Sequence, residues 1–464
     1  MYRLFSLPYL DDACPYFAAI RQHNAPVFLD SGKPRSGFGR YDIIAASPVA
    51  QLSYQHGKTT LSHLHTNTES LQGNPFSHLQ EMYQAYTKNC PPPADKDIAQ
   101  LPFCGGMIGY FSYDLGRSLE DLPELNPQDQ ELPDMQAAIY PWAIVVDHQE
   151  KRTQLITTPL IDLSHAEAIK AEIEAALAAP AEADSFKLIN RFSSNLTEQN
   201  YYDALDKVSD YIQAGDCYQV NFAQRFKASY EGDTWQAYLK LRAKAPTPYS
   251  GYIETPQGSI LSLSPEQFLE VDNGKVTTKP IKGTRPRGKT PEEDQHLAQE
   301  LIDSEKDRAE NLMIVDLLRN DISKVCQHGS VKVPKLFDIE SYANVHHLVS
   351  TVTGMLDTDK TALDLLEHSF PGGSITGAPK IRAMEIIEEL EHNRRSIYCG
   401  SIGYLSFSGR FDSSITIRTL LCHENKIHCW AGGGIVADSE TADEYQETYN
   451  KVNNLLQALE EGLH

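Results

Sequence analysis

The sequence has 464 residues, of which 41% are hydrophobic and 22% charged, a composition typical of a soluble globular protein with a large core. The formal net charge of −22 argues against general nucleic-acid binding, because a phosphate backbone needs clustered lysine and arginine. There is no apolar run long enough to cross a bilayer and no secretory signal pattern at the N-terminus, so we expect a cytoplasmic protein.

The N-terminal part of the chain predicts mainly paired strands. Alternating apolar residues predict strands at 27–30, 41–45, 51–64 and 140–146, with a polar turn at 31–39 and a helix at 75–87. The stretch 103–117 is rich in glycine and aromatic residues but lacks the G-K-[ST] of a phosphate-binding loop. Close packing of strands is therefore the better interpretation of its glycines.

The C-terminal part mixes strands and helices. An alanine-rich helix at 164–178 and a linker at 179–185 suggest three regions, 1–160, 161–195 and 196–464. Thr197 is expected to cap a helix that Gly215 ends. Strands are then predicted at 220–226, 250–253, 260–264, 415–422 and 426–431, and helices at 292–319, from about 379 and from about 441. The order predicts an α+β fold with much antiparallel sheet.

Eight cysteines are scattered without a C-x-x-C pair, which favours reduced thiols that pack in the core. Cys422-His423 and His428-Cys429 could suggest zinc. The residues between these pairs resemble the tip of a hairpin, which is the favoured interpretation.

Residues 280–287 are Pro-Ile-Lys-Gly-Thr-Arg-Pro-Arg. Lys282 therefore lies close to a proline, which fixes one backbone torsion, and next to a glycine, which allows the backbone to turn. Most lysines in such a turn are solvated and poor nucleophiles. Burial or a cationic neighbour lowers the pKa of a lysine and makes it nucleophilic. Lys282 is therefore a candidate nucleophile only if other residues nearby support a site.

Two predicted helices carry acids at helical spacing, Asp307 with Glu310 and Glu444 with Glu447. One such pair usually belongs to a solvated face. Two pairs beside apolar residues suit Mg²⁺, which prefers hard oxygen ligands and accepts a substrate carboxylate.

Three further stretches are suited to bind anions. Residues 374–380 combine backbone N–H groups, the Thr376 hydroxyl and a helix start at Pro379. Arg418 lies in a predicted strand with neighbouring apolar residues facing the other way, and its guanidinium suits a carboxylate. The glycines 432–434 would let backbone amides approach the same ligand. Together these features predict a site for a dianionic small molecule and a divalent cation.

Eight motifs between about residues 199 and 451 resemble the chorismate-utilising enzymes. They lie at 280–284, 307–311, 345–350, 370–380, 400–404, 417–419, 431–436 and 444–448. The stretches 29–32, 105–110 and 132–135 resemble the N-terminal region of the members that aminate chorismate. The resemblance implies an anthranilate synthase component I-like fold, in which two large, mainly antiparallel β-sheets pack as a sandwich with helices outside and the site between them.

Lys282 is the residue that discriminates within this family, because anthranilate-forming members usually carry alanine in Pro-Ile-Ala-Gly-Thr. The resemblance therefore implies a transferase that aminates chorismate at C4 with ammonia for folate synthesis. It assigns Lys282 as the covalent nucleophile at C2 and Glu266 as the general acid for the C4 hydroxyl. It assigns Glu310 and Glu447 as Mg²⁺ ligands, with Asp307 and Glu444 nearby.

The resemblance also implies residues around two ligands. The positions around chorismate are Gly283, Thr284, His347, Thr376, Tyr398, Arg418, Gly432, Gly433, Gly434 and Lys451. Ser31 with Pro248, Tyr249 and Ser250 resembles an amino-acid pocket that binds tryptophan in related members, and 38–41 match it loosely.

There is no recognisable glutaminase, because Cys217 lacks the glycine context of a nucleophile elbow. Ammonia would come from solution or from a separate glutamine amidotransferase subunit. Other hypotheses are anthranilate synthase component I, a salicylate or isochorismate synthase, a pyridoxal phosphate enzyme using Lys282, and an inactive binding module. Lys282 argues against anthranilate synthase, and the match of the N-terminal region argues against a salicylate or isochorismate synthase. The sequence shows no separate phosphate-binding stretch for pyridoxal phosphate, which argues against the cofactor enzyme. The intact set of charged residues argues against an inactive binding module.

Overall fold

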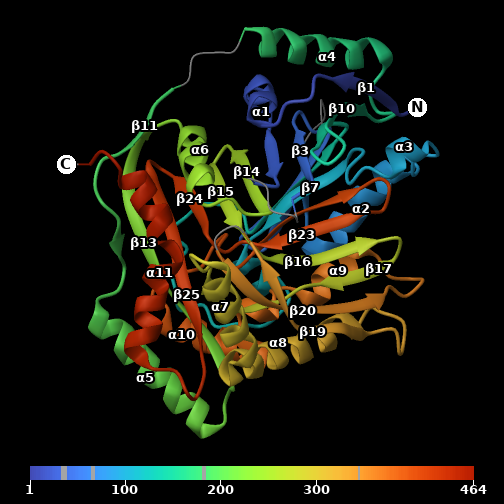
Figure 1. Ribbon diagram of the computed structural model, residues 1–464. Helices are drawn as coiled ribbons and strands as arrows, with labels where there is room; N and C mark the ends of the chain where they lie inside the picture. Colours follow the sequence, from blue (N-terminus) through green and yellow to red (C-terminus); the bar gives the residue numbers. More distant parts are fainter. Residues whose placement is uncertain (33–38, 64–67, 180–183, 343–344, 464) are drawn as a thin grey trace.

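A computed structural model describes residues 1–32, 39–63, 68–179, 184–342 and 345–463. Two large sheets are packed face to face, with helices around them (Figure 1). Every pairing between the described strands is antiparallel, in agreement with the predicted α+β sandwich. The parts of the predicted turn, strand and linker at 33–38, 64 and 180–183 lie outside the described residues.

Sheet I has 13 strands. They are β1 (Arg3–Leu7), β2 (Val27–Asp30), β3 (Tyr41–Ala45), β9 (Trp142–Asp147), β10 (Arg152–Thr157), β11 (Phe186–Leu188), β12 (Ser193–Ser194), β13 (Gln219–Gly232), β14 (Tyr249–Thr255), β15 (Gly258–Ser264), β21 (Gly377–Ala378), β24 (Thr419–His423) and β25 (Lys426–Ile435). Their main path is β1-β10-β9-β3-β2-β14-β15-β24-β25-β13-β11.

Sheet II has 12 strands. They are β4 (Ala50–Gln55), β5 (Lys58–His63), β6 (Glu69–Leu71), β7 (Gly106–Phe111), β8 (Met135–Tyr140), β16 (Gln267–Asp272), β17 (Lys275–Thr278), β18 (Ile281–Pro286), β19 (Lys332–Ser341), β20 (Val345–Met355), β22 (Ser401–Ser406) and β23 (Phe411–Ile415). The main path is β18-β20-β17-β16-β23-β22-β7-β8-β4-β5-β6, so both sheets contain strands from 1–160 and from 196–464. The predicted regions 1–160, 161–195 and 196–464 therefore do not correspond to the two sheets, and the division of the chain into them stays a prediction.

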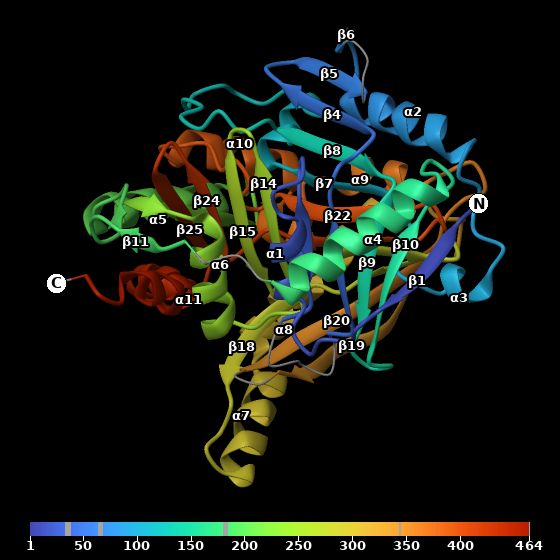
Figure 2. The same ribbon diagram turned by 90° about the horizontal axis from the view of Figure 1, so that it is seen from above.

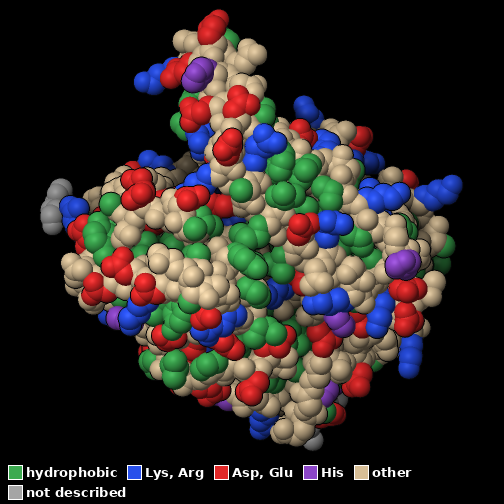
Figure 3. Space-filling view, turned by 90° about the horizontal axis from the view of Figure 1, so that it is seen from below, with side chains coloured by type: hydrophobic (Ala, Val, Ile, Leu, Met, Phe, Trp, Pro, Cys, Tyr) green, Lys and Arg blue, Asp and Glu red, His purple; other side chains and the backbone are tan. Residues whose placement is uncertain are grey.

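The helices cover the outer faces and ends of the sheets (Figures 1 and 2). They are α1 (Cys14–Ile20), α2 (Pro75–Thr87), α3 (Lys96–Ala99), α4 (Leu163–Ala178), α5 (Glu198–Ala214), α6 (Thr234–Lys244), α7 (Pro291–Asp303), α8 (Glu305–Ser323), α9 (Ala362–Ser369), α10 (Lys380–Leu390) and α11 (Thr441–Glu460), with short 3₁₀ turns η1 (Tyr113–Ser118) and η2 (Gly373–Ile375). α7 projects from the body, and Figure 3 shows the same projection in space-filling form.

Alternation along the strands explains the layers. In β2, Val27 belongs to the core between the sheets, whereas Phe28 packs under the outer helices. β25 repeats this pattern, with Trp430 facing the inter-sheet core and Cys429 facing α6 and α11. Because both faces of sheet I are covered, its strands β9 and β24 are buried along their whole length.

The prediction of one continuous helix at 292–319 is wrong. It is two helices, because Ser304 is extended (φ −66°, ψ 108°) and its hydroxyl accepts a hydrogen bond from the N–H of Asp307. Ser304 therefore ends α7 and caps α8. Other predicted boundaries are confirmed: Thr197 caps α5, and Gly215 ends it with a left-handed φ of 82°.

The strand predicted at 415–422 is also wrong. Ile415 ends β23 in sheet II, and β24 in sheet I begins only at Thr419. Cys422 and Cys429 lie in the apolar layer under the helices, so both thiols pack in the core. Within the described parts of the chain, no helix is long and apolar enough to span a membrane.

The predicted close packing of glycine-rich β7 is confirmed at Gly109, which lies between β8 and β22. A Cβ added at Gly109 would lie 2.6 Å from the Gln136 carbonyl oxygen and 2.7 Å from the Ala137 Cβ. We predict that Gly109→Ala lowers the free energy of unfolding by about 1–3 kcal/mol through overpacking.

Thermal unfolding followed by circular dichroism measures this change. Gly251→Ala is the matched control, since the nearest atom to its added Cβ is the Phe28 carbonyl oxygen at an ordinary 3.4 Å. Equal unfolding midpoints for the two variants would contradict the packing argument.

Candidate active site

Two crossings of the chain between the sheets form the centre of the candidate site. β15 of sheet I continues into β16 of sheet II through Glu266, and β23 of sheet II continues into β24 of sheet I through Arg418. The N–H of Ile415 donates to the Glu266 carbonyl oxygen (3.1 Å), and the N–H of Leu263 donates to the Arg418 carbonyl oxygen (3.1 Å). The two crossings are therefore held side by side.

Arg418 adopts a left-handed backbone conformation, with φ at 50°, at the crossing rather than within the predicted strand. This conformation is uncommon for a residue with a side chain and occurs often at functional sites. No hydrogen bond or ion pair joins its guanidinium to another residue in the described part of the chain. Burial lowers the pKa of Arg418, although the charge of Glu266 opposes this. A buried cation without a bonded partner is suited to receive an anion.

Lys282 and Glu266 meet across Ser374. The Lys282 amine on β18 donates to the Ser374 carbonyl oxygen (3.2 Å), and the buried Glu266 carboxyl shares a hydrogen bond with the Ser374 hydroxyl. Ser374 itself belongs to η2, so a strand, a sheet crossing and a loop converge on two titratable groups.

The environment moves the pKa values of these two groups toward each other. Burial lowers the pKa of Lys282, against the opposing negative charges of Glu310 and Glu266. Burial raises the pKa of Glu266 to about 7, against the hydrogen bond from Ser374 and the charge of Lys282. A carboxylic acid that still holds its proton near neutral pH is able to donate it, and an amine with a lowered pKa is able to attack.

The strand that carries Lys282 also positions Gly283 and Thr284. Gly283 is left-handed (φ 80°), and an added Cβ would lie 2.8 Å from the Asp307 carboxyl, so only glycine fits there. The Thr284 hydroxyl shares a hydrogen bond with Nδ1 of His347 (2.9 Å). Burial lowers the pKa of His347 to about 3, so its imidazole is neutral at neutral pH.

The two predicted acid pairs meet where α8 and α11 approach, since Lys306 lies 3.6 Å from Glu444. Burial raises the pKa of Glu310, and the negative charges of Asp307 and Glu444 add to the rise. The positive charge of Lys451, whose amine lies 2.7 Å from the Glu447 carboxylate, lowers the pKa of Glu447. Burial acts in the opposite direction but does not cancel this effect.

These carboxylates suit a cation that is shared with other ligands. Glu310 has no hydrogen bond or ion pair with another described residue, whereas Asp307 pairs with Arg285 at 3.4 Å. Among the described residues, no group of three or more His, Cys, Asp or Glu side chains lies close enough to hold a metal ion by itself.

The glycines of β25 form the wall under α11. A Cβ at Gly433 would lie 2.8 Å from a Glu444 carboxylate oxygen and 3.8 Å from the Lys451 amine. Lys451 also donates to the Gly432 carbonyl oxygen (2.8 Å). A ligand on this wall would contact both the backbone and the Lys451 ammonium.

Other predicted residues lie in the supporting structure. Thr376 is fully buried, and its hydroxyl donates to the Gly372 carbonyl oxygen (3.1 Å). Tyr398 is buried and stacks on Trp430, with ring centroids 6.2 Å apart. Gly434 packs against Gln219, whose side-chain nitrogen would lie 2.1 Å from an added Cβ.

Sequence reasoning missed three buried polar residues behind these groups. Glu391 and Arg395 form an ion pair (2.7 Å), and no motif indicated either residue. Gln219 is the only buried amide side chain among the described residues whose nitrogen and oxygen both lack a hydrogen-bond partner. An alternating strand pattern predicts that Gln219 is buried but not which ligand or water satisfies it.

Comparisons with known proteins agree with this geometry. The family model described as chorismate binding enzyme matches residues 24–457. The chain belongs to the chorismate-binding enzymes.

Several characterised members of the family are close relatives of this chorismate-binding enzyme. It is 48% identical to aminodeoxychorismate synthase component 1 of Escherichia coli (strain K12), over 96% of this chain and 95% of that protein. It is 39% identical to anthranilate synthase component 1 of Thermus thermophilus, over 94% of this chain and 93% of that protein. The crystal structure of anthranilate synthase component I from Streptococcus pneumoniae TIGR4 superposes with a TM-score of 0.80 at 32% identity, covering 91% of this chain and 93% of that one, which confirms the predicted fold.

A cavity of about 170 Å³ in this chorismate-binding enzyme has a lining that does not include Lys282 but does include Ser31, Pro248, Tyr249 and Ser250. The four residues predicted for the amino-acid pocket are thus brought together. Gly39, Arg40 and Tyr41 also line it, and Phe38 lies outside the described residues.

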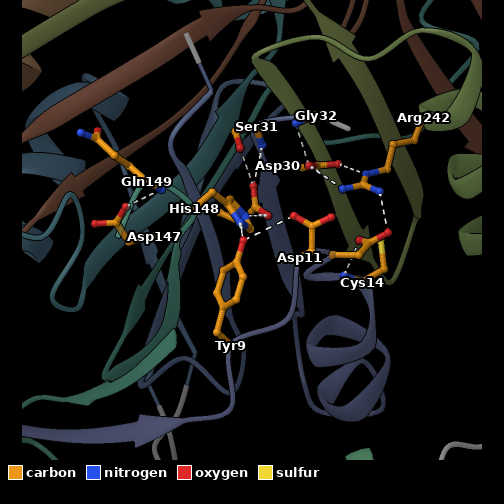
Figure 4. A network of polar contacts seen from close by, with 12 residues as sticks. Tyr9, Asp11, Cys14, Asp30, Ser31, Gly32, Asp147, His148, Gln149 and Arg242 are labelled. Carbon is orange, nitrogen blue, oxygen red and sulfur yellow. Dashed lines mark hydrogen bonds and ion pairs between the residues drawn. The ribbon is translucent and has the colours of Figure 1, made fainter. Parts of the chain in front are cut away.

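A buried polar network supports the Ser31 side of this cavity (Figure 4). The Ser31 N–H and hydroxyl both donate to Asp42 (2.8 Å each), and Asp42 in turn contacts His148 (2.7 Å). Asp30, next to Ser31, is held by Arg242 and by the Tyr238 hydroxyl. The cavity wall is therefore fixed by buried charges, and its shape is preorganised.

We predict that Lys282 reacts with an amine-specific reagent at lower pH than a surface lysine, because burial lowers its pKa. The measurement is competitive labelling across a pH series, with peptides quantified by mass spectrometry. Lys275, an exposed residue of β17, is the internal control. Superimposable pH profiles for the two lysines would contradict the lowered pKa.

Proposed function

We propose that this chain has aminodeoxychorismate synthase activity, transferring ammonia to C4 of chorismate to give 4-amino-4-deoxychorismate for 4-aminobenzoate and folate synthesis. The observation that carries the proposal is the amine of the half-buried Lys282 near the buried Glu266 carboxyl, with both joined to Ser374. The identity of 46–48% to three proteins named aminodeoxychorismate synthase component 1 supports it.

In the first half-reaction, the neutral Lys282 amine forms a bond to C2 of chorismate. The ring double bonds shift, the C4–O bond breaks, and Glu266 gives its proton to the leaving hydroxyl, which departs as water. The Glu266 carboxylate then takes up the proton that the alkylated amine releases. In the second half-reaction, ammonia bonds to C4, the double bonds shift back, and the C2–N bond to Lys282 breaks as the Glu266 carboxyl returns its proton to the leaving amine. The ammonium formed on C4 then gives a proton back to Glu266, which restores the acid and leaves the neutral amine product.

The anionic groups of chorismate need positive charge in a protein of net charge −22. Arg418 is proposed to bind one carboxylate with its unpaired guanidinium, and Lys451 lies at the glycine wall for another. Gly283, Thr284, His347, Thr376, Gly432 and Gly433 shape the site around the ring. Tyr398 and Gly434 are proposed to act from its edge.

Mg²⁺ is the proposed metal, held by Glu310 and Glu447 with Asp307 and Glu444 nearby. The carboxylate of Glu310, which has no ion pair with a described residue, supports this assignment. When bound, the cation supplies positive charge to a substrate carboxylate and fixes its orientation. Glu310 on α8 and Glu447 on α11 would hold the cation, and both carboxylates also act on the charge of Lys282.

The nitrogen source is proposed to be ammonia delivered by a separate glutamine amidotransferase subunit, in the cytoplasm. The relatives named component 1 support the existence of a partner chain. The cavity at Ser31 is proposed to hold a small amino acid. No nucleic acid or membrane has a part in this function.

The deciding experiment is incubation of the purified chain with chorismate, Mg²⁺ and an ammonium salt, with products separated by mass and ultraviolet spectrum. We expect 4-amino-4-deoxychorismate from the wild type. Lys282→Ala should lower its formation by about two orders of magnitude or more, because covalent catalysis is lost. Lys275→Ala, an exposed position on β17, is the control that should leave turnover unchanged.

Unchanged product formation by Lys282→Ala would exclude the covalent role, and anthranilate as the wild-type product would exclude the proposed reaction. With glutamine in place of ammonium, the chain alone should be inactive. A mass adduct on the peptide containing Lys282, formed from chorismate without ammonia, would be the direct sign of the intermediate.

The pH profile provides a separate test. Because Lys282 must lose a proton and Glu266 must keep one, kcat/KM should rise with pH and then fall, and one of the two limbs should lie near pH 7, the pKa of Glu266. Glu266→Gln should lower kcat by about a hundredfold or more and abolish that limb. A limb that persists at the same pH in Glu266→Gln would show that another group controls it.

Removal of a metal ligand should raise the Mg²⁺ concentration that the enzyme needs for activity. We predict that Glu447→Gln leaves the fold intact, since Glu447 is half-exposed, and raises the Mg²⁺ concentration needed for half-maximal activity at least tenfold. Glu440→Gln, which precedes α11, is the control with no predicted role at the metal. An unchanged Mg²⁺ requirement in Glu447→Gln would remove Glu447 from the metal site.

A further inference from the structure

Three successive carbonyl groups of the loop 374–376 are bonded to the surrounding scaffold. The Ser374 carbonyl accepts from Lys282 and from the Asn221 side chain (3.3 Å), and the Thr376 carbonyl accepts from the Asn221 N–H (2.8 Å). Between them, the Ile375 carbonyl accepts from Nη1 of Arg395 (3.0 Å). The direction of this backbone is therefore determined by contacts of its oxygen atoms.

The Arg395 contact also determines the direction of the next N–H. The peptide bond between Ile375 and Thr376 is trans, so its C=O and N–H point in opposite directions in one plane. With the oxygen held by Arg395, the Thr376 N–H points away from that side. Among the described residues it faces only the Gly373 carbonyl that closes η2, outside normal hydrogen-bond geometry, and Thr376 is fully buried. A buried N–H without an acceptor is costly unless a ligand or water supplies one.

Arg395 is itself held in one orientation. Its Nε and Nη2 atoms bond both oxygens of Glu391 (3.0 and 2.7 Å), and Nη2 also donates to the Asn221 carbonyl (2.6 Å). Its guanidinium lies over the ring of Tyr113, 4.7 Å from the centroid, and 5.8 Å from that of Tyr398. Only 2% of Arg395 is exposed, so its charge has no access to a ligand and acts on the site only through these neighbours.

We propose that Arg395 is a positioning residue for substrate binding: by holding the Ile375 carbonyl, it aims the Thr376 N–H at a carboxylate of the substrate. This inference rests on the proposed function for the identity of the ligand. It explains why a buried charge pair, which is costly to desolvate, lies directly behind the loop. Lysine has a single ammonium and cannot reproduce the planar fork that reaches Glu391 and Ile375 together.

The test is reversible chorismate binding, measured by calorimetry with Mg²⁺ in a Lys282→Ala background that cannot form the covalent intermediate. Arg395→Lys should raise the Kd for chorismate at least tenfold. Arg21→Lys is the control, because Arg21 is a two-pronged partner of Asp233 in another part of the fold and should change the Kd less than twofold. Thermal midpoints of both variants show how much stability each loses.

Glu391→Gln is the second variant, in case Arg395→Lys does not fold. It keeps Arg395 but weakens its anchor, and should raise the Kd at least threefold. An unchanged Kd in Glu391→Gln or in folded Arg395→Lys would overturn the positioning role. Failure of the parent protein to bind chorismate would instead overturn the proposed function, and this inference with it.

A spectroscopic measurement separates positioning from general loosening. In protein labelled with ¹⁵N-threonine, the Thr376 amide signal, assigned by its loss in Thr376→Ser, should shift on addition of chorismate. In Arg395→Lys the shift should be at most half as large at saturating chorismate. A shift of full size there would show that the N–H reaches the ligand without Arg395, and would overturn the proposal.

Discussion

The pairing of two chain crossings between the sheets is the constraint on which the site depends. Each crossing is short, and each bonds to a strand end of the other through Ile415 and Leu263. A change in the spacing of the sheets would therefore move Glu266 and Arg418 together. The acid and the guanidinium keep their relation to each other because backbone hydrogen bonds, which leave little freedom, connect their positions.

Burial then gives this geometry its chemistry. In water Lys282 would be protonated and Glu266 ionised at neutral pH, the opposite of what nucleophile and acid require. Loss of solvent disfavours both charged forms, whereas the attraction between the two groups favours them. For Glu266 burial is the stronger effect and raises its pKa to about 7. The carboxylates of α8 and α11 lie beyond Lys282, where a divalent cation would compensate their charge.

Residue patterns in the sequence predicted the fold class, and they named most residues of the candidate site. Lys282, the acids and the glycines 432–434 are local motifs, and their spacing alone pointed to an anion and a cation. Arg418 was identified, but not its conformation, because an apolar run such as 415–422 does not reveal that a strand ends in one sheet and restarts in another. Ser304 was likewise hidden inside a helical pattern. Glu391, Arg395 and Gln219 could not be predicted as neighbours of the site. Glu391 and Arg395 have the spacing of an ordinary helical ion pair, and Arg395 reaches the site only through backbone oxygens that are distant in sequence. The side chain of Gln219 has no hydrogen-bond partner among the described residues.

Each sheet pairs strands from the early and the late part of the chain, and this affects the nascent chain during synthesis on the ribosome. As the protein leaves the ribosome, β2 has only β3 beside it until β14 appears, and β7 has only β8 until β22 appears much later. The early part of the nascent chain thus carries one open, apolar strand edge until about the middle of synthesis and a second until near its end. Such edges pair readily with other chains. We therefore expect yield in overexpression to depend on translation speed and on chaperones more strongly than the stability of the finished fold would suggest.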